Sequence, residues 1–372
     1  MKEKTISFFR FFKNTASSYA AIKNAGQKRA LLPVFFGLLL IFSSCGPIER
    51  PGKPSASGRT GEMLVIMDKT LWDGYAGEAV RNVFSAHTPM LPQAEPMFDL
   101  VHLRPDNFGS LYETHRHIFR VNIGPEYERY SIEVRRDLWS QPQKVITVNA
   151  PSLSVFEEVM ENNTQAFHDL YLETERRRLV NAFRRTTNFD ARNKVRNLFD
   201  VDMYVPEGYL VVYQEDDFLY LRKSATREDF DQGILITVLD YTDPEKDFDP
   251  DVIWARRDSI TRAHVPGALP GSYMTTYPEL RPDFREVDFN GLYAMQARGL
   301  WRVEGDFMGG PFVTYTVVDE NTNRLFILDG WVFAPKYNKR DYLRQVDAAL
   351  HTINFDFREE KEKEESEPLA KN

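Results

Sequence analysis

The sequence predicts an α+β protein with two lobes, each built on a mainly antiparallel or mixed sheet packed with helices. Its 372 residues are enough for two domains. Hydrophobic residues make up 42% of the chain, as in ordinary globular proteins. Between residues 62 and 357, strand-like segments cluster together instead of alternating regularly with helices. This arrangement favours α+β over a doubly wound parallel sheet.

The N-terminal lobe is predicted over residues 62–200. The uncharged run Met63–Met67 is typical of a buried strand. Leu153, Phe156 and Met160 follow helical spacing after Ser152, a residue type that caps helices. We expect strands at residues 62–67, 98–103, 117–123, 130–135 and 144–148, and helices at 71–86, 105–114 and 152–185.

The C-terminal lobe is predicted over residues 201–357. Its strand-like runs are rich in β-branched and aromatic residues and are separated by turn-forming residues. Pro250 and Pro266 bound a helix between them. We expect strands at residues 203–205, 209–213, 218–222, 234–240, 291–301, 312–318 and 324–333, and helices at 251–264 and 338–353.

Residues 1–44 have the features of an export signal. Seven basic residues and one acid give residues 1–30 a charge of +6, and the uncharged run Leu31–Phe42 follows. This run is too short to cross a membrane but has the length of a signal-peptide core. Two serines then precede Cys45, the one cysteine of the chain. The order resembles the bacterial lipobox, in which the cysteine carries lipid, although Phe42 stands where leucine is usual. The alternatives are an ordinary signal peptide with a chance cysteine and a short buried core helix.

Two segments outside the lobes are expected to lack a core. Residues 45–61 are rich in Pro, Gly and Ser, which predicts a flexible tether between the lipid and the fold. Residues 358–372 mix glutamates with lysines and contain no aromatic residue. Such a composition predicts a charged, disordered tail.

The net charge excludes one class of partner. The whole chain carries −8, so removing the +6 leader leaves −14 on residues 45–372. An acidic surface repels phosphate backbones, which argues against a nucleic-acid partner and against a polybasic grip on anionic lipid. The expected membrane contact is therefore the lipid on Cys45. The sequence predicts no cofactor.

Two histidines form a candidate metal site. His115 and His117 lie two residues apart, so on a strand both imidazoles would point to one face, which suits a metal or an anion. Glu113, His102 and His87 lie nearby in the sequence. However, neither a His-Glu-x-x-His motif nor a second paired cluster supports a zinc site. The alternative interpretation is a pair of polar residues at a strand edge.

A glycine-rich segment, Gly305–Pro311, marks a candidate ligand-binding loop between two predicted strands. It matches neither the dinucleotide fingerprint nor a phosphate loop. Adjacent glycines indicate either a turn or a close approach of two backbones, so a purely structural turn is the alternative. The residues that we assign to this candidate ligand site are Arg298, Trp301, Asp306, Gly309 and Gly310.

Several short motifs resemble an uncharacterised domain-of-unknown-function family of bacteroidete envelope lipoproteins. They are Gly61–Asp68 with Trp72, Leu91–Pro96, His115–Ile118 and Met308–Phe312. The resemblance covers most of residues 58–355 and implies a place in the cell envelope, without an activity. In such lipoproteins an acidic run after the cysteine accompanies export to the cell surface. Gly46–Pro51 lacks that run, which implies the periplasmic side of the outer membrane. Val205–Tyr209 resembles PsbP-type domains, a likeness of fold alone.

These observations predict a lipid-anchored envelope protein that binds or scaffolds another envelope component, a protein or a glycan. The sequence contains no Gly-x-Ser-x-Gly elbow and no other catalytic signature, so we expect a non-enzymatic role. The alternative is a hydrolase that acts on envelope glycan or peptide with a pair of acids. The ligand, the partner and the oligomeric state cannot be read from the sequence.

Overall fold

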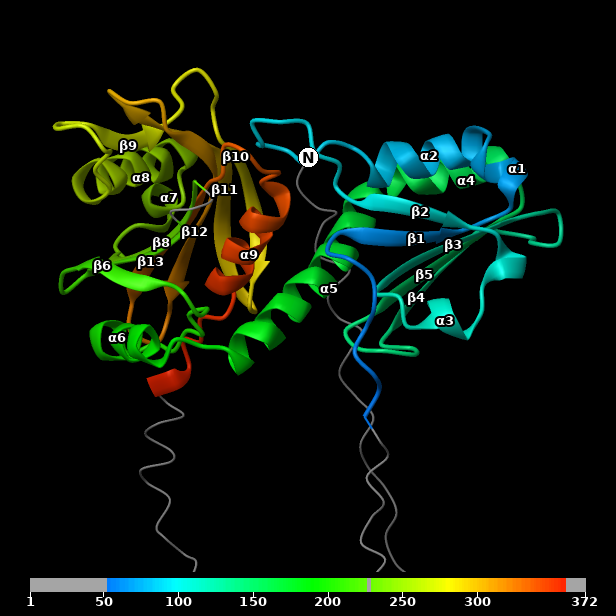
Figure 1. Cartoon of the computed structure of the whole chain (residues 1–372), viewed down its shortest axis with the longest axis horizontal. Coiled ribbons are helices and arrows are strands. Elements are labelled where there is room, and N and C mark those ends of the chain that lie inside the picture. Colours follow the sequence, from blue (N-terminus) through cyan, green and yellow to red (C-terminus); the bar gives the residue numbers. More distant parts are fainter. Residues whose placement is uncertain (1–51, 226–228, 359–372) are drawn as a thin grey trace, which may run out of the picture. The chain divides into compact units, whose positions relative to one another are not determined.

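The computed structural model describes residues 52–225 and 229–358, which form two lobes with one sheet each (Figure 1). The first sheet uses strands within residues 62–150 and the second uses strands within residues 210–333. The predicted α+β fold class is confirmed. The predicted signal peptide, Cys45 and residues 359–372 of the predicted tail lie outside the described residues.

The N-terminal lobe contains a five-stranded mixed sheet. Its strands are β1 (Glu62–Ile66), β2 (Asp99–Leu103), β3 (His117–Ile123), β4 (Ser131–Arg136) and β5 (Lys144–Ala150). They follow the order β2-β1-β3-β5-β4, and every pair is parallel except β4 with β5. Parallel strands are buried on both faces, which explains the apolar run of β1 after Glu62, whereas β3 and β5 also contain polar residues such as Arg120 and Asn149.

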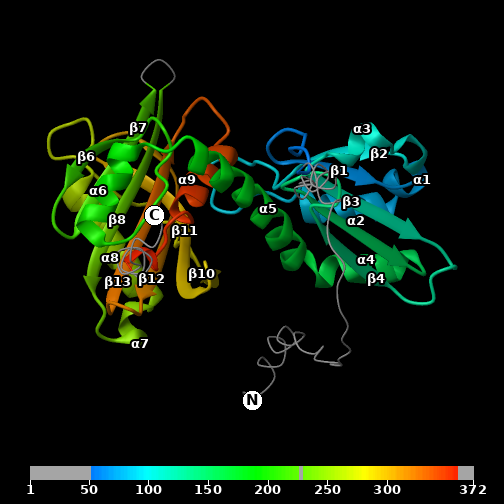
Figure 2. The same cartoon turned by 90° about the horizontal axis from the view of Figure 1, so that it is seen from below.

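Helices and short turns cover this sheet. They are α1 (Lys69–Trp72), α2 (Tyr75–Phe84), the 3₁₀ turn η1 (Pro105–Asn107), α3 (Ser110–Glu113), α4 (Leu153–Asn162) and α5 (Thr164–Arg185). Phe84, Phe156 and Phe167 anchor α2, α4 and α5 in the main core of the lobe. In both views α5 extends beyond the first sheet toward the second lobe (Figures 1 and 2).

One predicted helix is two helices in the structure. The single helix expected at residues 152–185 is interrupted at Asn163, which ends α4 and precedes α5. The Asn163 side chain donates a hydrogen bond to the carbonyl oxygen of Val159 at 2.8 Å, in competition with the helical backbone. The predicted cap is present, because Ser152 Oγ accepts a hydrogen bond from the Val155 amide at 3.4 Å.

The C-terminal lobe contains an eight-stranded antiparallel sheet. Its strands are β6 (Leu210–Gln214), β7 (Phe218–Ala225), β8 (Phe230–Asp240), β9 (Tyr273–Thr276), β10 (Asp283–Phe289), β11 (Leu292–Glu304), β12 (Gly309–Asp319) and β13 (Arg324–Phe333). The order is β10-β11-β12-β13-β8-β7-β6, with β9 also paired to β11. The long neighbouring strands β11, β12, β13 and β8 form its centre.

Helices pack on both faces of this second sheet. They are α6 (Phe189–Phe199), α7 (Pro244–Asp247), α8 (Pro250–His264) and α9 (Arg340–Leu350). Phe199 of α6 and Leu343 of α9 share one hydrophobic core with the sheet. Ile260 of α8 packs against a second core, built around Trp301 and Trp331 on the opposite face.

The elements α6, α7, β9 and β10 were not predicted, and the strand expected at residues 203–205 is absent from the described structure. The helix α6 buries Ala191, Val195 and Phe199, which repeat at a helical spacing of four residues. We expected residues 62–200 to form the first lobe. Instead α6 packs in the core of the second lobe.

The described part of the predicted tether is attached to the first lobe. The Ala56 amide donates to the Gln141 carbonyl at 3.1 Å, and the Ser57 amide donates to the Thr114 carbonyl at 2.8 Å. The Ser57 carbonyl in turn accepts from the Arg116 amide at 3.0 Å. Composition predicts flexibility here, but these backbone groups find partners on the lobe. Residues 54–57 therefore belong to the fold.

A residue of the N-terminal lobe caps a helix of the C-terminal lobe. The two oxygens of Glu95 accept hydrogen bonds from the backbone amides of Lys339 and Arg340, at 2.6 and 2.9 Å, where α9 begins. The Arg340 guanidinium also donates to Asp99 at 2.9 Å. The α9 N-cap, Lys339, has no capping side chain of its own. The first lobe thus supplies the acceptors that the helix end requires.

None of the described helices is both long enough and apolar enough to cross a membrane.

Candidate functional site

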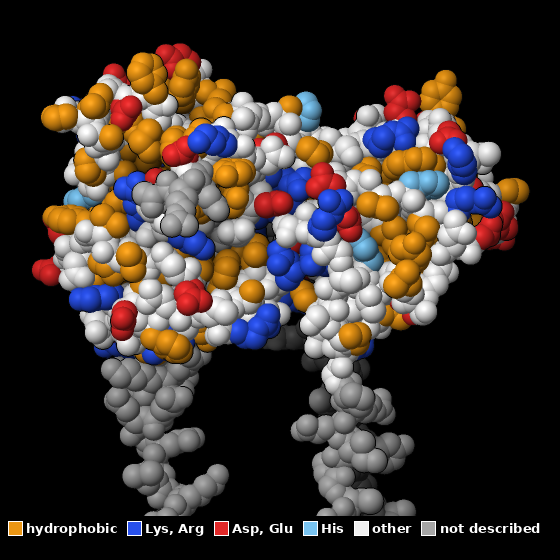
Figure 3. Space-filling model, viewed as in Figure 1, with side chains coloured by type: hydrophobic (Ala, Val, Ile, Leu, Met, Phe, Trp, Pro, Cys, Tyr) orange, Lys and Arg blue, Asp and Glu red, His pale blue; other side chains and the backbone are white. Residues whose placement is uncertain are grey.

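A cavity of about 900 Å³ lies between the two lobes. Its walls come from α5 on the N-terminal side, from β10, β11 and α9 on the C-terminal side, and from the loop between α2 and β2. Figure 3 shows basic and acidic side chains gathered in the depression between the lobes. The volume is within the range of small-molecule sites. This cavity is the candidate functional site.

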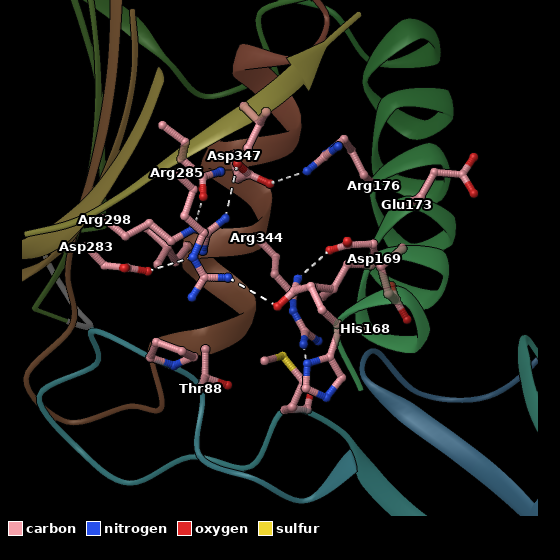
Figure 4. A pocket seen from close by; sticks show the side chains of 18 of the residues that line it. Thr88, His168, Asp169, Glu173, Arg176, Asp283, Arg285, Arg298, Arg344 and Asp347 are labelled. Carbon is pink, nitrogen blue, oxygen red and sulfur yellow. Dashed lines mark hydrogen bonds and ion pairs between the residues drawn. The ribbon is translucent and has the colours of Figure 1, made fainter. Parts of the chain in front are cut away.

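The floor of the cavity is built around Asp347 of α9. The hydroxyl of Tyr315 donates a hydrogen bond to its Oδ1. The Arg176 Nη2 atom, from α5, lies 3.4 Å from Oδ2, and the Arg298 Nη2 atom, from β11, lies 3.5 Å from Oδ1. The two arginines approach the carboxylate from different sides (Figure 4). One carboxylate therefore links α5 of the first lobe to the sheet of the second.

The surroundings of Asp347 keep it ionised. Burial opposes ionisation, but the charges of Arg176 and Arg298 and the hydrogen bond from Tyr315 hold the pKa of Asp347 well below its ordinary value. His351 lies one turn further along α9, with Nδ1 3.9 Å from Asp347 Oδ1. Burial and the charge of Arg176 lower the pKa of His351 to about 3. At neutral pH this imidazole is therefore uncharged.

Arg344 adds a third guanidinium to the floor. Its Nη2 donates to the Met97 carbonyl oxygen at 2.6 Å, and its guanidinium carbon lies 5.2 Å from the centre of the Phe98 ring. Its Nη1 has no hydrogen bond in the described structure, and its ion pair with Asp341 is long, at 3.7 Å. Burial and the charge of Arg340 lower the pKa of Arg344 to about 10, so it stays charged at neutral pH.

The rim of the cavity is acidic. Carboxylates there come from both lobes and include Asp169, Glu173, Asp283, Glu286 and Asp288. Arg285 is the rim arginine, and it donates to Asp283 at 2.8 Å and to Gln165 of α5 at 3.4 Å. Arginines thus dominate the floor and carboxylates the rim. A ligand with an anionic and a cationic end would find opposite charge at each end.

The two candidate histidines do not share a ligand position. His117 Nε2 donates a hydrogen bond to Glu175 Oε1 at 2.8 Å, whereas His115 Nε2 lies 3.0 Å from Glu62 Oε1. His102, which we placed near them, stacks on Trp72 at 4.8 Å between ring centroids. Within residues 52–225 and 229–358, no group of three or more His, Cys, Asp or Glu side chains could hold a metal.

Glu175 of α5 is instead the centre of a buried network. Its carboxylate accepts hydrogen bonds from His117, Arg116, Arg178 and the Gly61 amide, at 2.8 to 3.2 Å. Burial opposes its ionisation, but the hydrogen bond from His117 and the charges of Arg116 and Arg178 hold the pKa of Glu175 far below its ordinary value. Burial lowers the pKa of His117, so its imidazole is neutral.

The residues assigned to the glycine-rich candidate site do not come together. Arg298 and Trp301 both lie on β11, but three positions apart, so they occupy opposite faces of the sheet. Arg298 reaches the cavity. Trp301 is buried in the other core, where its Nε1 donates to the Val332 carbonyl at 3.2 Å. Asp306 lies in the turn after β11 and accepts from the Phe307 amide at 2.7 Å.

Both glycines of the pair belong to a strand. Gly309 pairs with Arg302 and Gly310 with Trp301 where β12 begins. A Cβ atom on Gly310 would lie 2.0 Å from the Val332 carbonyl oxygen, and one on Gly309 would lie 2.9 Å from the Trp301 carbonyl oxygen. These glycines therefore permit a close approach of backbones within a strand, and they do not form the structural turn that was the alternative interpretation.

The sequence analysis did not identify Arg176, Arg344 or Asp347. A usable signal was present on the last predicted helix, where Arg344, Asp347 and His351 follow helical spacing between buried apolar positions. A polar stripe at that spacing places three functional groups on one helix face. Its partner Arg176 lies 171 residues away in the chain, so no local pattern connects the two.

The fold and the cavity define this chain as a two-lobed α+β protein with a polar cavity between its lobes. Two family models match it, one for each lobe. Residues 56–184 match the domain of unknown function DUF8532, and residues 188–352 match the domain of unknown function DUF4837. The expected resemblance to an uncharacterised domain family is therefore confirmed. The bacteroidete lipoprotein character that the motifs imply stays a prediction.

No curated protein matches the chain. Similar solved structures include a mutant of the protein Mog1, with 10% identity, a TM-score of 0.27, and coverage of 42% of this chain and 90% of that chain. The Saccharomyces cerevisiae Ran-binding protein Mog1p gives 10% identity, a TM-score of 0.29, and coverage of 42% and 89%. Similarity at this level supports no conclusion about fold or function.

Proposed function

We propose that this protein is a lipid-anchored component of the cell envelope that binds another envelope component without catalysing a reaction. The proposal places the lipid on Cys45 and the folded lobes on the periplasmic side of the outer membrane. Its support is the lipobox-like sequence around Cys45 and the acidic charge of the mature chain, which disfavours nucleic acid as a partner.

The observation that carries the binding role is the cavity between the lobes. It has a volume of about 900 Å³, three arginines in its floor and carboxylates from both lobes at its rim. We place a small zwitterionic ligand there, such as a peptide with free ends. Its carboxylate would accept hydrogen bonds from Arg344 and Arg298, and its ammonium group would meet the acidic rim.

Hydrolysis is the less supported role. A glycan or peptide hydrolase that uses two acids needs one protonated carboxyl near neutral pH. Asp347, the carboxylate at the centre of the cavity floor, has a lowered pKa and already accepts from Tyr315 and pairs with Arg176 and Arg298. It therefore cannot act as a general acid at neutral pH. Binding without turnover is the function that this geometry supports best.

Calorimetric titration with a defined probe tests the ligand site. The probe is a tripeptide of three alanines, compared with its C-terminal amide and its N-acetyl form. We expect the free peptide to bind and both blocked forms to bind at least tenfold more weakly, because each lacks one of the two charges. Equal binding of the three forms, or of none, contradicts the zwitterion assignment.

A matched pair of variants locates the binding. Arg298→Gln removes a guanidinium from the cavity floor and should weaken binding of the free peptide about tenfold. Arg129→Gln removes an exposed arginine that does not line the cavity, and it should leave the affinity unchanged. Equal effects of the two substitutions would place the peptide elsewhere.

The anchor is tested by fractionation of cells that express the Cys45→Ala variant. We expect this variant to leave the membrane fraction, because one residue carries the lipid. Mass spectrometry of the parent should find residue 45 acylated and residues 1–44 removed. A variant that stays membrane-bound would contradict the anchor and leave the cavity proposal to its own test.

A further inference from the structure

A second, smaller cavity lies where the chain joins the fold. It has a volume of about 420 Å³ and lies between residues 55–56, the turn at residues 137–142 and α5. Three arginines of α5 line it, Arg177, Arg178 and Arg185, together with Asn181. Its one carboxylate is Asp137. Three arginines against one carboxylate give this cavity a local excess of positive charge, opposite to the net charge of the chain.

The α5 helix presents these groups together because of their spacing. Arg177, Asn181 and Arg185 are four residues apart and therefore lie along one face of the helix. Arg177 pairs with Asp137 at 2.6 Å, and its buried Nε has no hydrogen-bond partner in the described structure. Arg185 is exposed, and no described residue forms a hydrogen bond or ion pair with it.

Arg178 is less available than its neighbours. Its Nε donates to Glu175 at 3.1 Å and its Nη2 donates to Thr60 at 3.2 Å. The capacity of the cavity for an anion therefore rests mainly on Arg177 and Arg185. A guanidinium presents several N–H donors in one plane, which matches the oxygens of a phosphate group.

The position of the cavity in the chain limits its distance from the proposed lipid. Ten residues along the chain lead from Cys45 to Ser55, which lines the cavity. A fully extended chain spans at most about 3.5 Å per residue, so these two positions are within about 35 Å of each other whatever the intervening conformation. A lipid on Cys45 would hold this cavity close to the headgroups of the same membrane.

We propose that this arginine-lined cavity binds the phosphate of an anionic membrane lipid, whose headgroup carries no cation to offset the phosphate charge. The inference rests on the proposed anchor at Cys45, which keeps the cavity near the membrane, and it is separate from the ligand of the interlobe cavity. The overall negative charge disfavours binding of anionic lipid over a broad surface. A single headgroup phosphate, however, needs positive charge only inside this cavity. The bound headgroup would fix which side of the fold faces the bilayer.

Vesicle sedimentation tests this proposal with residues 45–372 carrying Cys45→Ala, which contain the whole described fold but no acyl chain. The probes are vesicles of phosphatidylcholine alone and vesicles with three parts in ten of phosphatidylglycerol, an anionic lipid. We expect binding to the anionic vesicles that weakens as salt is raised. Equal binding to both vesicle types, or none, overturns the proposal.

Two neighbouring arginines provide the matched comparison. Arg185→Gln should weaken vesicle binding about fivefold, the equivalent of about 1 kcal/mol for one arginine at an anionic surface. Arg184→Gln removes the same charge one residue away, from a side chain over the Tyr204 ring and outside the cavity, and should have no effect. Arg185→Lys should retain most of the binding. Equal loss from the two glutamine substitutions overturns the site.

Titration with inorganic phosphate separates the two sources of the anion. We expect millimolar or weaker affinity for free phosphate and tighter apparent binding to anionic vesicles. Phosphate binding without vesicle binding overturns the membrane assignment. Because this protein carries no lipid and its readout does not involve the peptide probe, failure here is distinguishable from failure of the anchor or of the interlobe ligand site.

Discussion

Glu175 and Asp347 are two buried carboxylates on the helices that meet between the lobes, α5 and α9. Glu175 is 2% exposed and accepts four hydrogen bonds of 2.8 to 3.2 Å, all from its own lobe. Asp347 has guanidinium partners at 3.4 and 3.5 Å, from both lobes, and also accepts a hydrogen bond from Tyr315. Both carboxylates line the cavity, but the partners of Glu175 stabilise one lobe, whereas the longer ion pairs of Asp347 link the two lobes.

The largest effect is expected from Glu175→Gln. The substitution leaves the buried Arg116 guanidinium without its counter-charge, so we expect a loss of about 3–5 kcal/mol in the free energy of unfolding, measured by urea denaturation. The control is Glu158→Gln on the neighbouring helix α4. Glu158 is exposed and has no ion-pair partner among the described residues, so its loss should cost less than about 1 kcal/mol. Similar losses in the two variants would contradict a special role for the Glu175 network.

Asp347→Asn should cost less, about 2 kcal/mol by the same measurement. Its partners Arg176 and Arg298 are 30% and 24% exposed, so water can replace part of what the carboxylate provides. A loss as large as that of Glu175→Gln would erase the difference between the two carboxylates.

The pH dependence of stability should report on His351, which faces Arg176, Asp347 and Arg298. Its folded pKa of about 3 lies below the unfolded value of about 6.5. The unfolded chain therefore binds a proton that the folded chain does not, and stability falls as the pH drops from about 6.5 toward 3. This group contributes a slope of about 1.4 kcal/mol per pH unit. His351→Gln should flatten the profile in that window, and an unchanged slope would exclude His351 as the titrating group.

Glu95→Ala should have the smallest effect, about 1 kcal/mol on the free energy of unfolding. It removes the acceptors for two backbone amides at the start of α9, which is a capping loss. The exposed Glu128→Ala of the first lobe is the control and should change nothing measurable. The comparison between the lobes is sharpened if Glu95→Ala also weakens binding of the peptide probe, because Arg344 and Asp347 lie on the helix that Glu95 caps, α9.

Local sequence patterns account for most of the fold. The strand expected at residues 117–123 has those bounds in the structure, because the segment is rich in β-branched and aromatic residues, which favour strands. The helix α6 was missed although its buried residues, Ala191, Val195 and Phe199, repeat at a helical spacing of four. The predicted flexible tether includes residues that belong to the fold. Composition does not show which backbone groups find hydrogen-bond partners, and the backbone of Ser57 finds them at Thr114 and Arg116.

The candidate site was harder to predict. Arg298 was assigned to a ligand site, but with Trp301, which the alternation of side chains along β11 places on the other face. The Arg176–Asp347 pair depends on how two lobes pack, and packing between distant segments leaves no periodic trace in the chain. Charged residues on a predicted helix are read as solvent-facing, yet the cavity is lined by just such residues.

The Glu95 cap has a consequence for dissecting the chain. The second matched domain begins at residue 188, but the amides of Lys339 and Arg340 obtain their acceptors from Glu95 of the first. A truncated protein that begins at residue 188 would leave the amides of Lys339 and Arg340 without these acceptors. A relative that carries the second domain alone should therefore have Ser, Thr, Asp or Asn at the position of Lys339, where this chain relies on a neighbour.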